Sequence, residues 1–168
     1  DNVTDQGTSG NDNMSGDASA NVMVAGLGND TLDGNGGIDA LIGGGGDDII
    51  IYDSADRAIR GGTGNDTLRL EGGDDIDFTA IHNNLITSIE VLDLATDGGA
   101  NDITLDFLDL IKLSGDQNTL TITGTGLDSV TFNDLGYAAS VGSAGGFDTY
   151  DYGGFFLQID EDISQTII

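Results

Sequence analysis

The chain has 168 residues, of which 30 are acidic and only 4 are basic, so its formal charge is −26 at neutral pH. This charge argues against nucleic acid and anionic membrane surfaces as partners. Because the chain has no cysteine, disulfides and thiolate zinc sites are excluded. No apolar run approaches the roughly 18 residues of a membrane-spanning helix, so we expect no membrane insertion. Residue 1 is Asp and no signal peptide opens the chain, which indicates a fragment of a longer protein.

An apolar residue recurs at every ninth position between Gly7 and Arg69. These residues are Met14, Met23, Leu32, Leu41, Ile50, Ile59 and Leu68. An Asp or Asn stands two positions before most of them, and a Gly usually stands four positions before. The best copies are the blocks 25–33, 43–51 and 61–69. The first six residues of a block suit a turn, where glycine permits positive φ angles, and the last three suit a short strand whose middle side chain points inward.

These blocks resemble the RTX nonapeptide, G-G-x-G-x-D-x-U-x, which forms a calcium-binding parallel β-roll. Two nonapeptides complete one coil, so successive blocks alternate between two sides, which we call the odd and the even side. The resemblance implies an all-β fold with two parts. A parallel β-roll (β-solenoid) of RTX repeats is expected over residues 1–78, and a β-rich C-terminal cap or type I secretion region over residues 79–168.

On the odd side, the sixth position of each block is an aspartate: Asp12, Asp30, Asp48 and Asp66. In the RTX family each ion lies between the turns of successive coils. One turn gives the carbonyls of positions 2 and 4 and its carboxylate, and the next gives the carbonyls of positions 1 and 3 and its carboxylate. The resemblance thus implies three calcium sites here. They would use Thr8, Gly10 and Asp12 with Ala25, Leu27 and Asp30; Gly26, Gly28 and Asp30 with Gly43, Gly45 and Asp48; and Gly44, Gly46 and Asp48 with Gly61, Thr63 and Asp66. The alternative is a set of Asp- and Gly-rich turns without metal.

The even side is less regular. The resemblance implies one site there, which would use Asp17, Ser19 and Asn21 with Gly34, Gly36 and Asp39, so that three to four calcium ions are expected in all. In the next even block Arg57 stands at the ligand position. Two interpretations stay open: its guanidinium replaces an ion and pairs with Asp39 or Asp75, or it points into water.

Apolar residues also flank the inward positions and should face outward. They are Val22, Val24, Ala40 and Ile42 on the even face, and Ile49 and Ile51 on the odd face. Such rows usually mark a covered surface, so we expect the rest of the chain or a neighbouring domain to pack there. The alternative is an aggregation-prone surface that charge keeps apart.

The repeat pattern breaks at residues 70–78, and alternating Leu, Ile and Thr follow. Strands are expected at 89–94, 101–107, 118–123, 128–132, 147–152 and 155–160, with a helical turn at 108–113. Four stretches, 88–94, 118–124, 126–132 and 154–163, resemble the segment that follows RTX repeats near the C-terminus of giant bacterial biofilm and ice-binding adhesins. Those proteins leave the cell by type I secretion with an uncleaved C-terminal signal. The tail 163–168 is compatible with such a signal, and equally with a last β-strand.

Catalytic motifs are missing from the sequence. The single histidine, His82, has no H-E-x-x-H context, and no G-x-S-x-G elbow occurs. Paired carboxylates such as Asp47 and Asp48 suit metal binding better than acid–base catalysis. We therefore expect no enzyme.

The resemblance implies a calcium-dependent folding module at the C-terminus of a secreted adhesin of the bacterial cell surface. Without a divalent cation the acidic chain should be disordered. The implied partners are calcium, the type I secretion machinery and the preceding domains of the adhesin. One alternative is an ice-binding β-solenoid, although the outward row Asn13, Thr31, Ile49 and Thr67 is irregular. Another is the tail of a secreted RTX enzyme or toxin, and a carbohydrate- or protein-binding role for the second half also stays open.

Overall fold

The computed structural model describes residues 3–81, 85–94, 98–133 and 139–168. His82, expected to be a surface or loop residue, lies outside these ranges. Short strands dominate the first half. They are β1 (Val3–Gln6), β2 (Asn13–Ser15), β3 (Asn21–Leu27), β4 (Thr31–Asp33), β5 (Ala40–Gly45), β6 (Ile49–Ile51), β7 (Ala58–Thr63), β8 (Thr67–Arg69), β9 (Ile76–Asp77) and β10 (Ile86–Thr87).

The second half is also rich in strands and contains a short helix. Its elements are β11 (Val91–Asp93), β12 (Asp102–Asp106), α1 (Phe107–Leu113), β13 (Thr119–Thr123), β14 (Ser129–Asn133), β15 (Ala139–Ala144), β16 (Phe147–Asp151), β17 (Phe156–Asp160) and β18 (Ser164–Ile167). The six strands and the helical turn expected from the sequence are all present, within a few residues of their predicted bounds. The tail contains β18, as its interpretation as a last β-strand predicted, and its role as a secretion signal stays a prediction.

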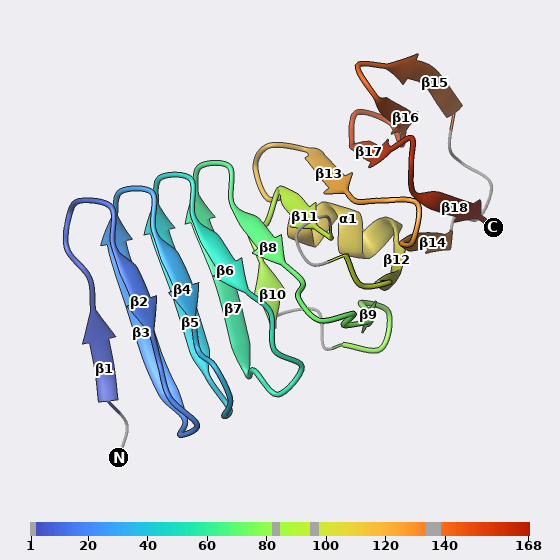
Figure 1. Cartoon of the computed structure of the whole chain (residues 1–168). Helices are drawn as coiled ribbons and strands as arrows, with labels where there is room; N and C mark the ends of the chain where they lie inside the picture. Colours follow the sequence, from blue (N-terminus) through green and yellow to red (C-terminus); the bar gives the residue numbers. More distant parts are fainter. Residues whose placement is uncertain (1–2, 82–84, 95–97, 134–138) are drawn as a thin grey trace.

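In the repeats the chain alternates between two parallel sheets. One has the strand order β1-β3-β5-β7-β10, and the other contains β2, β4, β6, β8 and β11 in succession. Among β1 to β8, paired strands are 18 residues apart, so that Met23 lies opposite Leu41 and Leu41 opposite Ile59. Figure 1 shows the resulting coils side by side, with the N-terminus at one end of the stack. The odd turns line the upper edge in this view and the even turns the lower edge.

The ninefold spacing decides which residues form the core. Six of the seven predicted inward residues, from Met23 to Leu68, are at most 1% exposed, whereas Met14 in the first coil is only partly buried. A strand of three residues turns its middle side chain inward, as in β4, where Leu32 is buried between the half-buried Thr31 and Asp33. Each coil therefore adds a pair of large apolar side chains to the core at a spacing set by strand pairing.

The second half continues this stack at its far end. β11 pairs with β8, and β13 and β17 follow in the same nine-stranded sheet, while β9, β12, β14 and β18 form a third, parallel sheet. The buried apolar residues of both halves form one continuous cluster, which runs from Met23 to Ile163. The sheet and the core both cross residue 78, so neither divides the chain there. The predicted domain boundary at residue 78 stays a prediction.

Helix α1 begins where the sequence supplies a capping box. The Asp106 side chain accepts hydrogen bonds from the backbone N–H groups of Leu108 and Asp109, and the Asp109 side chain accepts one from the Asp106 N–H. Such a reciprocal cap satisfies backbone donors that a short helix leaves unpaired. The loop after α1, residues 114–117, is placed by this helix next to the last repeat turn.

The outward apolar rows remain half-buried at the flanking strand positions, except for Ala40, which is 9% exposed. The described part of the chain does not cover these rows, because it extends the stack along its axis (Figure 1), and cover by a neighbouring domain stays a prediction. Burial of Ile42 and Ile49 comes instead from side chains one coil away, which stack in register.

Candidate metal centre

A column of carboxylates lies along the odd turns, one per coil. The backbone N–H of Asp12 donates to Oδ1 of Asp30 at 2.8 Å, Asp30 donates to Asp48 at 2.9 Å, and Asp48 donates to Asp66 at 2.9 Å. Each bond joins residues 18 apart. We call Asp12, Asp30, Asp48 and Asp66 the odd column. The 18-residue coil stacks these four predicted ligands directly above one another.

The second oxygen of three of these carboxylates is unusual. Oδ2 of Asp30, Asp48 and Asp66 is buried and has no hydrogen-bond partner among the described residues. Asp12 differs, because its Oδ2 accepts hydrogen bonds from the Thr8 N–H at 2.6 Å and the Thr8 hydroxyl at 2.9 Å. A buried carboxylate oxygen without a donor costs free energy that a bound cation would recover.

Glycines hold the space between successive odd turns open. A Cβ at Gly43 would collide with Asp48 Oδ2 and with the Gly61 carbonyl oxygen, and a Cβ at Gly7 would collide with the Ala25 carbonyl and lie 2.9 Å from Asp12 Oδ2. These carboxylate and carbonyl oxygens are paired in the first and third predicted sites. The first-position carbonyls thus meet the carboxylates as the resemblance implied.

The carbonyls of turn positions 2 and 4 point at the next coil. A Cβ at Gly44 would meet the Gly26 carbonyl, and one at Gly46 would meet the Gly28 carbonyl. Gly44 and Gly46 have φ values of 125° and 120°, which only glycine adopts readily. The third-position carbonyl of Gly45 accepts a hydrogen bond from the Gly28 N–H at 2.8 Å, and it keeps a second lone pair for a ligand.

This donor set fits calcium. Ca²⁺ takes six to eight oxygen ligands and accepts backbone carbonyls beside carboxylates. Among the described residues no group of three or more Asp, Glu, His or Cys side chains has metal-ligand geometry, so each gap would use two carboxylates and several carbonyls. Structural zinc sites and softer metals are usually built from histidine nitrogen or cysteine sulfur, which the odd turns do not offer.

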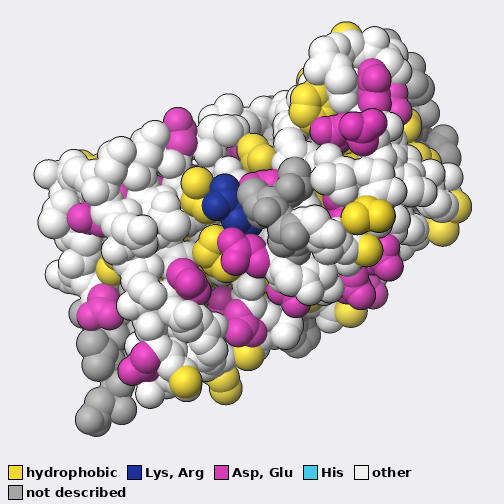
Figure 2. Space-filling view, in the orientation of Figure 1, with side chains coloured by type: hydrophobic (Ala, Val, Ile, Leu, Met, Phe, Trp, Pro, Cys, Tyr) yellow, Lys and Arg dark blue, Asp and Glu magenta, His cyan; other side chains and the backbone are white. Residues whose placement is uncertain are grey.

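The electrostatics of the odd column also call for a cation. Burial raises the pKa of Asp48, and the neighbouring Asp30 charge raises it further, while a hydrogen bond from the Asp30 N–H lowers it. Burial likewise raises the pKa of Asp66 to about 6. Figure 2 shows acidic side chains spread over the visible face, with basic side chains near its centre. No basic side chain is among the causes that shift the pKa values of Asp48 and Asp66, and the neighbouring charges that raise these values are all negative.

A second ladder runs outside the odd column, one position earlier in each turn. Backbone N–H groups of Asn29, Asp47 and Asn65 donate to the side-chain Oδ1 atoms of Asn11, Asn29 and Asp47, at 2.9 to 3.0 Å. These side chains are exposed, and Asn occupies most of the positions. The negative charge of Asp47 is therefore not needed for this ladder.

The even side has its own column of ligand candidates. The Asn21 N–H donates to Asp39 Oδ1 at 2.6 Å, and the Asp39 N–H donates to Asp56 Oδ1 at 3.2 Å. Oδ2 of both Asp39 and Asp56 is buried and lacks a partner. Burial raises the pKa of Asp56 to about 7. The predicted even-side residues Asn21 and Asp39 are thus brought together, and Asp56 extends them by one coil.

The prediction that Arg57 occupies the ligand position is wrong. Asp56 takes that position, 17 residues after Asp39 instead of 18, because the N–H groups of Arg57 and Ala58 both donate to the Asp39 carbonyl, at 2.9 and 3.3 Å. Arg57 itself is exposed, and no ion pair of its side chain occurs among the described residues. Of the two interpretations, the one that points it into water is correct.

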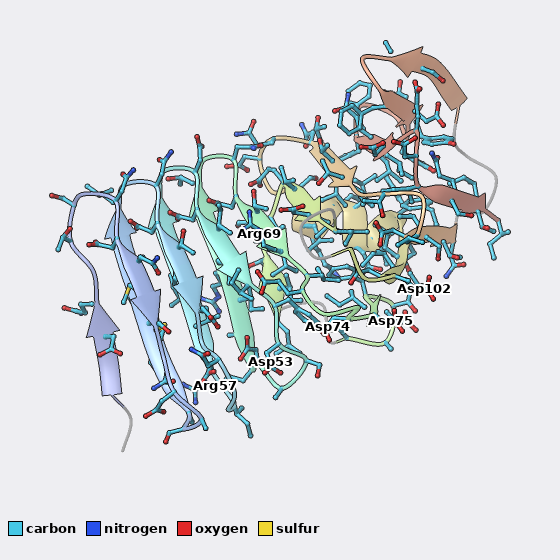
Figure 3. All side chains as sticks on the ribbon, in the orientation of Figure 1. Asp53, Arg57, Arg69, Asp74, Asp75 and Asp102 are labelled. Carbon is cyan, nitrogen blue, oxygen red and sulfur yellow. The ribbon has the colours of Figure 1, made fainter. Side chains whose placement is uncertain are left out.

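Asp75 is likewise not the next member of the even side. β10 follows β7 there, with Ile86 opposite Ile59. Asp75 instead precedes β9 and accepts the Asp102 N–H at 2.9 Å in the third sheet. Figure 3 shows Arg57 at the lower edge of the coils and Asp75 and Asp102 together beside β9.

Glu90, which the repeat pattern did not predict, follows Asp66 in the odd column. The Asp66 N–H donates to Glu90 Oε2 at 2.9 Å, and burial raises the pKa of Glu90 to about 7. A signal for it exists, because Glu90 stands two residues before the buried Leu92, just as Asp66 stands two residues before Leu68. The change in spacing after Arg69 hid this correspondence.

One family model matches the repeats. It is described as the RTX calcium-binding nonapeptide repeat (4 copies), and it matches residues 6–41, 25–56 and 58–76, less than half of the chain. A search of curated proteins finds no match. Among the described residues no helix is long and apolar enough to cross a membrane. The matched segment thus carries RTX repeats, supports an RTX β-roll, and marks a calcium-binding module typical of secreted proteins.

Proposed function

We propose that this chain is a calcium-dependent folding module of a secreted bacterial cell-surface adhesin, placed near the C-terminus of that protein. The observation that carries the proposal is the odd column, in which buried carboxylate oxygens of Asp30, Asp48 and Asp66 have no donor among the residues that the structure describes. Bound calcium would supply the positive charge and the coordination that these oxygens lack. The residues that would hold the ions are those of the three odd gaps and of the even gap at Asn21 and Asp39.

The charge of the chain explains why folding would depend on the ion. With 30 acidic and 4 basic residues, stacking one carboxylate per coil about 4.8 Å apart is repulsive without counterions. In a calcium-poor cytosol the repeats would then stay unfolded, which suits export through a narrow type I secretion channel. Outside the cell, the β-solenoid would form and rigidify the adhesin.

The free energy of calcium binding is large enough to drive folding of the repeats. Extracellular calcium modules have dissociation constants on the order of 0.1–1 mM. At a calcium concentration ten times the dissociation constant, one site adds about 1.4 kcal/mol of stability, so four sites add about 6 kcal/mol. This is comparable with the whole stability of a small domain. Asp30 and Asp48 each lie between two gaps, which should make binding cooperative.

The adhesin context is supported by the resemblance of the second half, which forms the strands expected of it. An ice-binding face would instead need regular outward rows of Thr or Asn, and Ile49 interrupts the row that contains Thr31 and Thr67.

A calcium titration tests the proposal. Circular dichroism of the full chain should show little β-structure with a chelator and a cooperative gain of β-structure at millimolar calcium. Magnesium should act far more weakly, because it prefers to keep its waters. A chelator-treated chain with the same β signal and the same thermal midpoint would overturn the proposal.

A further inference from the structure

The odd column continues past the last nonapeptide into the second half. β11 pairs with β8 so that Leu92 lies opposite Leu68, 24 residues away. Glu90 therefore lies one strand beyond Asp66, and it accepts the Asp66 N–H as each aspartate accepts the N–H of the coil before. Here the turn has only three residues, Ser88 to Glu90, in place of six. The Glu90 side chain has one methylene group more than an aspartate, so its carboxylate reaches further from the backbone.

A second loop takes the place of the missing part of the turn. Residues 115–117, which follow α1, lie across from residues 62–64, and between them is a cavity of about 240 Å³ that Ser88 and Glu90 also line. The Gln117 side-chain amide donates to the Gly64 carbonyl at 3.4 Å. Asp116 is exposed at the same cavity. The cavity is mostly polar and is lined by residues from both halves of the chain.

A carboxylate oxygen of Asp66 lies beside the residues that line this cavity. Asp66 is fully buried, and its Oδ2 has no hydrogen-bond partner within the described part of the chain. A Cβ at Gly61 would collide with Asp66 Oδ2 and the Ser88 carbonyl together, just as a Cβ at Gly43 would collide with Asp48 Oδ2 and the Gly61 carbonyl. The Ser88 carbonyl therefore stands where a nonapeptide places its first-position carbonyl. Ser88 has a φ of 56°, which is uncommon for serine.

We propose that a further calcium ion binds between Asp66 and Glu90, at the junction of the repeats and the second half. Its donors would be the carboxylates of Asp66 and Glu90 and the carbonyls of Ser88, Gly62 and Gly64, with Asp116 adding negative charge. The inference rests on the proposed function, since it extends the calcium sites to a turn that is not a nonapeptide. It gives the ion a coupling role, because donors come from both halves.

Backbone hydrogen bonds carry this coupling onward. The Ile89 N–H donates to the Leu113 carbonyl at 2.8 Å, and the Thr121 N–H donates to the Glu90 carbonyl at 2.8 Å. Fixing residues 88–90 therefore fixes the end of α1 and the position of β13. Calcium would order the second half through this junction even though that half contains no nonapeptides.

The test counts bound calcium in the full chain by native mass spectrometry and measures amide hydrogen exchange over residues 113–123. The variants are E90Q, which keeps an acceptor for the Asp66 N–H, and D116N, an exposed change that leaves the fold intact. The controls are E161Q and D162N, which remove the same charge from exposed residues outside the cavity. All five proteins are compared with calcium and with a chelator.

We expect E90Q to bind one ion fewer than the wild type and to lose about tenfold in calcium-dependent protection over residues 113–123, the factor that one site at ten times its dissociation constant contributes. D116N should weaken one site, and neither control should change. If E90Q and D116N bind as many ions as the wild type with unchanged protection, the junction site is refuted while the proposed function stands. If the wild type binds no calcium, both fail.

Discussion

Replacing Asp48 by Asn is the sharpest test of the odd column. The change keeps Oδ1 as the acceptor for the Asp30 N–H, which lies 2.9 Å away. It removes the charge and turns the unpartnered Oδ2 into an N–H₂ group. Asp48 borders two predicted sites, so both should lose calcium affinity. At ten times the dissociation constant, losing two sites costs about 2.8 kcal/mol, which corresponds to a decrease in thermal midpoint of roughly 6 to 11 °C for a chain of this size.

The effect of D48N on the stability of the fold should change sign when calcium is removed. Burial raises the pKa of Asp48, which means that its charge is unfavourable in the metal-free fold, so Asn should then be neutral or stabilising. The control is D47N, the same substitution at the exposed neighbour whose ladder already uses Asn elsewhere. Thermal unfolding by circular dichroism with calcium measures the loss for both variants, and the β signal with a chelator measures the metal-free effect. An unchanged thermal midpoint of D48N with calcium, or an equal loss for D47N, would refute the metal role of Asp48.

Three further predictions concern pH, the even column and the core. Burial raises the pKa of Asp66 to about 6 and of Asp56 to about 7. Without metal, circular dichroism should thus show β-structure that is gained below about pH 4, where these carboxyls are protonated, and lost as the pH rises through 6 to 7. With calcium, acidification should destabilise instead, because protons compete for the carboxylates. D56N should lower the number of bound ions measured by equilibrium dialysis, whereas R57Q should not, and a loss only in R57Q would reverse our assignment. Leu68 is fully buried, so L68A should cost about 2–5 kcal/mol of stability in the calcium-bound form, and an unchanged thermal midpoint with saturating calcium would contradict its packing role.

The regular part of the site could be predicted because the covalent repeat and the coil have the same length. Asp30, Asp48 and Asp66 recur every 18 residues, and parallel strand pairing then stacks them without further information. Leu32 and Ile50 are inward for the same reason, since a three-residue strand between turns has one inward position. Where the spacing alone defines the geometry, the sequence determines which residues form the odd column, which glycines lie in its turns and which side chains form the core.

Only the tertiary structure decided where that spacing fails. Asp56 reaches the even column because two N–H groups share the Asp39 carbonyl, which absorbs one residue in the turn. Glu90 joins the odd column across an insertion of six residues, and the loop 115–117 completes its surroundings from 25 residues further along the chain. Such contacts depend on which strands pair after the repeat ends, and pairing at long range is set by the packing of the whole core instead of by any local pattern.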